Sequence, residues 1–200
     1  GGSPMDAAKA IATLAVQERT DEEIFAGGYE AKALPMAHVP TTAGTGSEVT
    51  PYSILTNDAR QTKTSISSPA MFPRLAFLDG KYMENLPVAS TVNTALDAFS
   101  HAVEGMLSRN ATPLSDMLAK ESLRILYPLL SKTAGKLTLE ERDELLYASM
   151  LAGMTIAQSG TTAVHGMGYS LTYFYGVDHG RAAAFERAGE QGVLLCLPVF

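Results

Sequence analysis

The sequence has 200 residues, of which 46% are hydrophobic, and its formal net charge is −6. With a mean hydropathy of +0.05 and Lys and Arg scattered along an acidic chain, it predicts a globular protein that binds neither nucleic acid nor membrane. The single cysteine, Cys196, excludes an intrachain disulfide and fits a reducing cytoplasm, where we expect it to be a buried small hydrophobe.

The chain begins with a glycine pair before a helical pattern. Gly1-Gly2-Ser3-Pro4 predicts a helix over residues 5–12 with Ser3 as the N-cap and Pro4 at the first helical position. Such a helix start favours a phosphate, although the same residues also form ordinary turns. In nucleotide-binding folds a β-strand precedes this loop, so the natural beginning of the domain is expected upstream of Gly1.

A loop rich in small and hydroxylated residues follows a short strand predicted at residues 37–40. Residues 41–48 read Thr-Thr-Ala-Gly-Thr-Gly-Ser-Glu. Amides and hydroxyl groups packed this densely suit a loop that wraps a polar ligand. The alternative is a plain flexible loop.

Three further strands are predicted at residues 52–56, 63–67 and 74–78, the first two joined by a turn at Asn57-Asp58. Lys63 lies in the second of these and either faces a cofactor phosphate or ribose or is simply solvated. From Leu86-Pro87 onward the pattern becomes helical. We therefore expect a domain boundary there, with an α/β domain at 1–86 and a helical domain at 87–200.

The second half predicts long helices at residues 90–107, 113–130 and 139–158. Residues 159–162 break the third, a short helix is expected at 165–173, and a turn at 176–180 carries His179. Phe185 to Gly192 lie between this turn and the final apolar residues.

Asp97 and His101 are four residues apart in the first of these helices, so their side chains leave the same face. A carboxylate and an imidazole so placed can share a divalent cation, although a local hydrogen bond is the commoner use of such a pair. Two later histidines, His165 and His179, each precede a glycine. All four side chains would form an Asp-His-His-His shell.

Four motifs in order resemble those of the iron-dependent (group III) alcohol dehydrogenases. They are Gly-Gly-Ser-Pro-Met-Asp-Ala-Ala-Lys at 1–9, Pro-Thr-Thr-Ala-Gly-Thr-Gly-Ser-Glu-Val-Thr at 40–50, Asp-Ala-Phe-Ser-His-Ala-Val-Glu-Gly at 97–105, and the His-Gly steps at 165 and 179. The resemblance implies an α/β portion followed by an all-α portion. The first would be part of a Rossmann-like dinucleotide-binding domain and the second a helical metal-binding domain, in a dehydroquinate synthase-like architecture.

The resemblance also assigns roles to individual residues. As metal ligands for Fe²⁺ or Zn²⁺ it implies Asp97, His101, His165 and His179. For NAD or NADP it implies Gly1, Gly2 and Ser3 at the pyrophosphate, Thr41, Thr42 and Thr45 near the phosphates and nicotinamide, and Lys63 on the ribose side. Tyr169 stands where some family members carry a further histidine, so a proton-relay histidine is not expected here.

The function implied is hydride transfer between a small alcohol or diol and NAD(P), with the metal polarising the substrate oxygen. Family members are often dimers or larger, which implies a homo-oligomer. Two alternatives remain. One is a dehydroquinate synthase-like enzyme that uses NAD and a metal, and the other is an inactive or partner-dependent fragment that keeps the metal helices.

Overall fold

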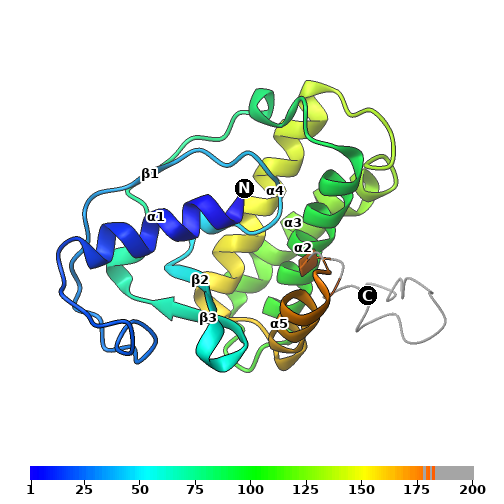
Figure 1. The fold of residues 1–200 in the computed structure, drawn as a ribbon. Coiled ribbons are helices and arrows are strands. Elements are labelled where there is room, and N and C mark those ends of the chain that lie inside the picture. The colour runs from blue at the N-terminus through cyan, green and yellow to red at the C-terminus, as the bar shows by residue number, and fades with distance from the viewer. Residues whose placement is uncertain (178, 181, 183–200) are drawn as a thin grey trace.

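The structure is a computed structural model that describes residues 1–177, 179–180 and 182. In Figure 1, helix α1 and the strands form one half of the molecule, and α2 to α5 form the other. The elements in chain order are α1 (Gly2–Leu14), β1 (Ala37–His38), β2 (Tyr52–Asn57), β3 (Thr62–Ser67), β4 (Leu75–Ala76), α2 (Val88–Leu107), α3 (Pro113–Leu130), α4 (Leu139–Ser159) and α5 (Ala163–Tyr175).

Helix α1 begins earlier than the sequence predicted. Its first residue is Gly2 and its N-cap is Gly1, so the prediction of Ser3 as N-cap was wrong. Pro4 is accommodated inside the first turn, because the amides of that turn have no intrahelical acceptor and a missing N–H costs nothing there. The first-turn amides, with Gly2 and Ser3 among them, form the positive end of the helix.

The strands form two separate pairs. β2 and β3 pair antiparallel with Tyr52 opposite Ser67, and the turn between them is closed where the Asn57 side chain accepts a hydrogen bond from the amide of Arg60. The predicted hairpin is therefore present. The predicted strand at 74–78 shortens to β4, which pairs in parallel with β1 and places Ala37 opposite Leu75.

Helices α2, α3 and α4 pack around a common apolar core. The helices α3 and α4 each begin with a capping box, from Thr112 and Thr138 respectively, which satisfies amides that the first turn leaves free. α2 supplies buried alanines to this core, whereas α3 and α4 supply leucines as well as alanines. The core residues include Ala95, Ala98, Ala102, Leu126, Leu129, Leu145, Leu146, Ala148 and Ala152.

The loop at 41–48 is wedged between the two halves. Gly46 has a φ of +59°, and a Cβ added there would lie 2.5 Å from the Gly153 Cα in α4. A Cβ added at Gly44 would lie 2.8 Å from the Thr94 carbonyl oxygen in α2. Close backbone packing therefore explains both glycines, and a plain flexible loop is excluded because Ala43, Gly44, Gly46 and Ser47 are buried.

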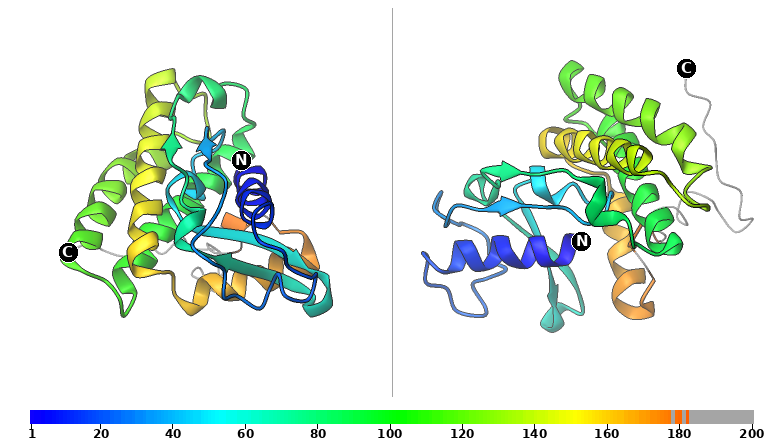
Figure 2. Two further views of the ribbon diagram at one scale, coloured as in Figure 1. Left: turned by 90° about the vertical axis from the view of Figure 1, so that its left-hand side faces the viewer. Right: turned by 90° about the horizontal axis from the view of Figure 1, so that it is seen from above.

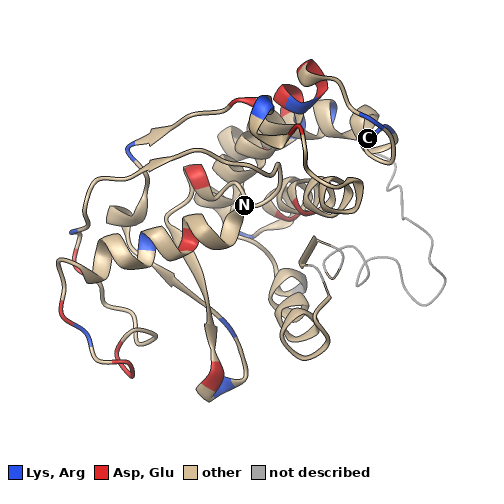
Figure 3. Cartoon of the chain, turned by 45° about the horizontal axis from the view of Figure 1, so that its top comes forward, with Lys and Arg blue, Asp and Glu red and all other residues tan. Residues whose placement is uncertain are grey.

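The architecture is the predicted one, a small α/β portion followed by an all-α portion. In the two views of Figure 2, α4 lies between the strands and α3. Figure 3 shows Lys and Arg interspersed with Asp and Glu over both halves in that view. Within the described part of the chain, none of the helices combines the length and apolarity needed to cross a membrane.

Candidate metal centre

Helix α2 presents Asp97 and His101 toward the interior on successive turns. His101 Nε2 lies 3.7 Å from Asp97 Oδ1, and both side chains are buried. The spacing of four residues places both on one face of α2, as the sequence predicted. Because Ala95, Ala98 and Ala102 cover the packed side of the same helix, the polar pair is held against the cavity described below.

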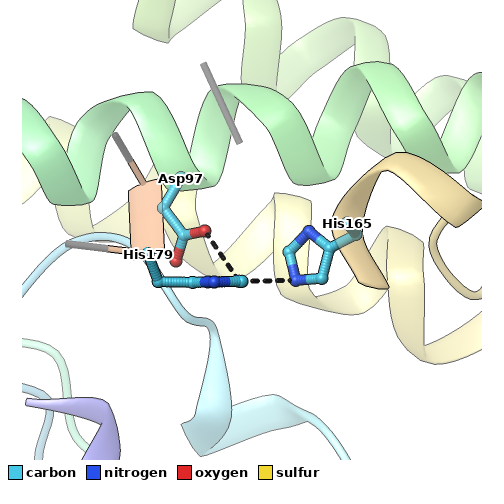
Figure 4. A group of neighbouring side chains, drawn as sticks. All are labelled: Asp97, His165 and His179. Carbon is cyan, nitrogen blue, oxygen red and sulfur yellow. Dashed lines mark hydrogen bonds and ion pairs between the residues drawn. The ribbon is translucent and has the colours of Figure 1, made fainter. Parts of the chain in front are cut away.

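His165 and His179 reach the same point from later parts of the chain. His165 lies in the first turn of α5, and its Nε2 is 2.9 Å from His179 Nε2, which is 3.9 Å from Asp97 Oδ1. Figure 4 shows these three side chains pointing toward one another. Gly180 permits this approach, since an added Cβ would overlap the Asn93 carbonyl oxygen on α2.

The donor atoms fit one divalent ion. One donor atom each from Asp97, His165 and His179 lies within 4.8 Å of the others. Ligands at bond lengths of 2.0–2.2 Å in a tetrahedral site are separated by about 3.3 Å. The measured separations of 2.9 Å and 3.9 Å bracket that value. Asp97 Oδ1 is also buried and accepts no hydrogen bond from the described residues, so it is available as a ligand.

His101 adjoins this three-residue group but lies outside its closest set. Its ring centroid is 4.9 Å from that of His165, with the rings inclined at 39°. All four residues implied by the resemblance are therefore brought together around one point, three within the tight group and His101 beside it.

Burial sets the protonation of these groups. It lowers the pKa of His179 to about 4 and, with the neighbouring His165, lowers the pKa of His101 to about 3. Burial raises the pKa of Asp97, while His179 and His165 act in the opposite direction. His101 and His179 are thus neutral near pH 7, which is the form in which imidazole binds metal ions.

A further carboxylate at the site was missed in the sequence. Glu104 of α2 accepts hydrogen bonds of 2.8 Å from both the amide and the hydroxyl group of Thr162. Its other oxygen, Oε1, lies 3.5 Å from His165 Nδ1. Burial alone would raise the pKa of Glu104, but these contacts lower it to about 2. Its spacing of seven residues from Asp97 was the available signal, because it places both on one helix face.

Tyr169 packs on the histidines instead of supplying a fourth imidazole. Its ring stacks on that of His179, with centroids 5.1 Å apart and an angle of 23°, and meets His165 edge-on at 5.8 Å. Tyr169 therefore covers one side of the candidate metal centre.

A cavity of about 480 Å³ connects the metal centre to the start of α1. Both halves of the molecule line it, and Tyr52 and Ile156 join across it through a 3.1 Å hydrogen bond from the tyrosine hydroxyl group. Of the predicted cofactor residues, the cavity lining includes Gly2, Ser3, Thr45 and Lys63.

The remaining three predicted cofactor residues lie beside that lining. Thr41 accepts a 2.6 Å hydrogen bond from the amine of Gly1, and a Cβ added at Gly1 would lie 3.6 Å from Thr42. A Cβ added at Gly2 would lie only 2.6 Å from the Thr45 methyl group, so Gly2 is also required for packing. Cys196 and residues 185–192 lie outside the described residues.

Comparison with known proteins gives matches over both halves. Residues 1–80 match the model of the iron-containing alcohol dehydrogenases, and residues 91–187 match that of the C-terminal part of the Fe-containing alcohol dehydrogenase family. The NAD-dependent methanol dehydrogenase of Bacillus methanolicus is 32% identical over 90% of this chain and 48% of its own length. The 1,3-propanediol dehydrogenase of Klebsiella pneumoniae is 36% identical over 92% of this chain and 48% of its own length.

Solved structures agree with these relatives. An iron-containing alcohol dehydrogenase from Thermotoga maritima superposes with a TM-score of 0.85 at 46% identity, covering 92% of this chain and 50% of that one. A sulfoacetaldehyde reductase from Bifidobacterium kashiwanohense, solved with NAD⁺, gives 0.81 at 32% identity, again with 92% and 50% covered. The chain belongs to the iron-containing alcohol dehydrogenase family. It spans about half the length of the curated relatives it matches.

Proposed function

We propose that this protein is a metal- and NAD(P)-dependent alcohol dehydrogenase that acts on small alcohols or diols and, in reverse, reduces the corresponding aldehydes. The observation that carries the proposal is the buried convergence of Asp97, His165 and His179, with His101 beside them, at the end of a cavity that also reaches the start of α1. Relatives named as methanol and 1,3-propanediol dehydrogenases support this substrate class.

The proposed metal ligands are Asp97, His101, His165 and His179. One carboxylate and three neutral imidazoles leave the site net positive with a divalent ion, and Fe²⁺ is favoured by the family while the donor set also accepts Zn²⁺. When bound, the ion would supply Lewis acidity toward the substrate oxygen.

The start of α1 is the proposed phosphate site of NAD or NADP. Gly2 and Ser3 offer first-turn amides and the positive helix end to a pyrophosphate, with Gly1, Thr41, Thr42 and Thr45 around them. Lys63 lines the cavity from β3 and would face the cofactor ribose. A solved relative that holds NAD⁺ supports a nicotinamide cofactor.

In the proposed reaction an alcohol loses a hydride and a proton to become an aldehyde; NAD(P)⁺ takes up the hydride, and the hydroxyl proton is released to solvent. The task of the chain is to hold the alcohol carbon and the nicotinamide close together in this cavity. The Asp97–His101 end of the cavity orients the substrate oxygen, and the apolar side chain of Ile156 and the ring of Tyr169 shield it.

The proposal also covers the division into domains, the cellular compartment and the oligomeric state. Residues 1–86 would form the cofactor-binding part and residues 87–200 the metal-binding part, with the cavity between them. We place the protein in the cytoplasm, because a chain with one cysteine suits a reducing compartment. A homo-oligomer is proposed because two large apolar side chains are exposed in and just after β4. Leu75 is 55% exposed and Phe77 is 54% exposed.

The first test is metal content after anaerobic purification, measured beside NAD(P)H consumption on a panel of small aldehydes. We expect about one Fe or Zn per chain in the wild type, as a four-ligand site predicts, with both metal and activity lost in His165→Ala. His38→Gln is the matched control, because His38 is the histidine that is not a proposed metal ligand and it lies outside the cavity lining. Absence of metal from the wild type would contradict the proposal.

The same panel separates the alternatives. Metal retained without turnover would favour the inactive or partner-dependent chain, to which the exposed Leu75 and Phe77 also point. A dehydroquinate synthase-like enzyme would hold metal and NAD but would not interconvert simple alcohols and aldehydes, so product analysis distinguishes it.

A further inference from the structure

Glu104 is a fully buried carboxylate, 0% exposed, next to the proposed metal centre. It lies on α2, three residues after His101, and its two oxygens face different partners. Oε2 accepts hydrogen bonds of 2.8 Å from the amide and the hydroxyl group of Thr162. Oε1 lies 3.5 Å from Nδ1 of His165.

These contacts tie α2 to the beginning of α5. Thr162 is the N-cap of α5, and His165 follows it three residues later in the first turn. A buried carboxylate is costly unless it is hydrogen-bonded, and the N-terminus of a helix is a favourable place for one. The Thr162 bonds therefore fix Glu104 in a position from which Oε1 faces the edge of the His165 ring.

The two nitrogens of His165 point in opposite directions. Nδ1 faces Glu104, whereas Nε2 lies 2.9 Å from Nε2 of His179, on the side of Asp97. A histidine that binds a metal through one nitrogen usually donates its other N–H to a carboxylate or carbonyl group, which fixes both the tautomer and the ring orientation. His165 places its ring nitrogens in the same way, with Nδ1 facing a carboxylate oxygen at 3.5 Å, an ion-pair distance longer than the usual hydrogen bond.

We propose that Glu104 is a positioning residue for His165: it holds the proton on Nδ1 and directs the unprotonated Nε2 toward Asp97 and His179. The inference rests on the proposed metal centre and adds to it the group that orients one of its ligands. Thr162 takes part indirectly, because it holds Glu104 and does not itself contact the metal-facing nitrogen.

A purely structural role makes a different prediction. Glu104 would then act only as an anchor for the start of α5, as Glu141 does for α4, where its carboxylate accepts a 2.9 Å hydrogen bond from the amide of the N-cap Thr138. Loss of such an anchor lowers stability but leaves the metal affinity of the folded protein unchanged. The two roles therefore separate in a binding measurement.

The test is the dissociation constant for Zn²⁺, measured by chelator competition on the metal-stripped full chain, for the wild type, Glu104→Gln and Glu141→Gln. We expect Glu104→Gln to bind Zn²⁺ about 10- to 100-fold more weakly, the usual effect of losing such a partner. Glu141→Gln is the matched control, since it alters a carboxylate that accepts from a helix N-cap outside the cavity lining. It should stay within about twofold of the wild type.

A second readout follows the proton directly. The chain has four histidines, so a histidine-labelled ¹⁵N spectrum is simple enough to assign. In the Zn²⁺-loaded wild type, His165 should show its proton on Nδ1, and Glu104→Gln should shift or lose that signal. Thermal unfolding of the metal-free variants checks that each is folded.

Thr162→Val tests the indirect contact and serves if Glu104→Gln fails to fold. It removes one of the two hydrogen bonds to Glu104, so a loss in Zn²⁺ affinity of about 2- to 10-fold is expected, smaller than that of Glu104→Gln. If folded Glu104→Gln bound Zn²⁺ within twofold of the wild type, the positioning role of Glu104 would be overturned while the metal centre would stand. If only Thr162→Val folds, the same result in that variant would have the same meaning. A wild type that binds no Zn²⁺, Co²⁺ or Fe²⁺ would overturn the metal centre together with it.

Discussion

Tyr169 shows how one aromatic side chain takes part in the candidate centre without being a ligand. Its ring lies nearly parallel to that of His179 and edge-on to His165. Stacked aromatic rings stabilise one another by about 0.5–1.5 kcal/mol beyond the area they bury. The tyrosine thus holds His179, which follows α5 in the chain, in its place beside Asp97.

We therefore expect Tyr169→Phe to keep the metal affinity of the wild type and Tyr169→Ala to lower it about 2- to 10-fold, the range that the stacking energy gives. Chelator competition with Zn²⁺ measures both. If the phenylalanine variant lost as much affinity as the alanine variant, the hydroxyl group and not the ring face would be responsible.

Lys9 is a second residue whose environment sets its chemistry. Its ammonium group is 0% exposed and donates hydrogen bonds of 2.8 Å to the Ser47 hydroxyl group and to the Tyr52 carbonyl oxygen. Burial lowers the pKa of Lys9 to about 8, although Asp6 and Glu48 act in the opposite direction. The lysine therefore joins α1 to the 41–48 loop and to the start of β2.

This pKa predicts a pH-dependent stability. Between about pH 8 and the ordinary lysine pKa of 10.5, folded Lys9 is largely neutral while the unfolded chain still holds the proton. Unfolding then takes up a proton, so the contribution of Lys9 to the free energy of unfolding rises with pH, by at most about 1.4 kcal/mol per pH unit. Urea unfolding of wild type and Lys9→Met from pH 7.5 to 10 should show the difference between them rising.

The control is Lys120→Met, which alters an exposed lysine on α3. The difference in free energy of unfolding between the wild type and this variant should not change with pH. A wild-type advantage that stays constant or falls above pH 8 would show that Lys9 keeps its proton in the folded protein.

The sequence alone identified some of the residues at the candidate site and missed others. Asp97 and His101 were found because both lie on one helix, where spacing alone fixes the face. Lys9 reads as an ordinary helix lysine, because its partners are 38 to 43 residues away in the sequence. The role of Glu104 depends on Thr162, 58 residues later, and no local pattern records that contact.

At the scale of elements, local signals decided which predictions held. The helix α3 was placed at its observed bounds because Thr112 and Pro113 mark its start unambiguously. The helix α1 begins at Gly2, two residues before the predicted first position, Pro4. Glycine can adopt helical geometry where tertiary packing supports it, and the first turn tolerates Pro4. Pairing of β1 with β4 was not predictable, since parallel pairing joins segments 38 residues apart through no local turn.

The contact between the 41–48 loop and α4 gives an element-scale prediction. A Cβ added at Gly153 would lie 2.8 Å from the Gly46 Cα and 2.9 Å from the Val49 side chain. Since backbone cannot move aside as a flexible side chain does, we expect Gly153→Ala to lower the free energy of unfolding by about 1–3 kcal/mol, the usual cost of overpacking. Urea unfolding measures the change.

Gly166→Ala is the matched control, because Gly166 lies inside α5 and a Cβ there would meet nothing within 4 Å. Alanine is a better helix former than glycine by up to about 1 kcal/mol, so this variant should be as stable as the wild type or more so. Equal losses in the two variants would show that the loop does not press on α4.

At the scale of the molecule, the cavity depends on both halves staying together. Tyr52 of the hairpin bonds to the Ile156 carbonyl oxygen of α4, and Tyr173 of α5 donates a 3.2 Å hydrogen bond to Asp58 at the hairpin turn. The metal centre adds a connection within the helical half, because its proposed ligands span residues 97 to 179 and come from α2, α5 and the segment beyond α5. An ion bound there would link parts of the chain that only the folded state brings together.

Metal removal should therefore lower the stability of the whole fold. A ligand that binds only the folded state stabilises it by about 2.7 kcal/mol at a free concentration 100 times the dissociation constant, and somewhat less if unfolded histidines also bind the ion. Thermal unfolding with added Zn²⁺ and again with excess chelator should show the transition temperature falling when the metal is removed. In His165→Ala the two temperatures should nearly coincide, because Nε2 of His165 is one of the three donors closest together. If the transition temperature of that variant shifted as much as that of the wild type, the stabilising ion would bind elsewhere. A site that has lost one of its converging ligands cannot connect α5 to α2 as before.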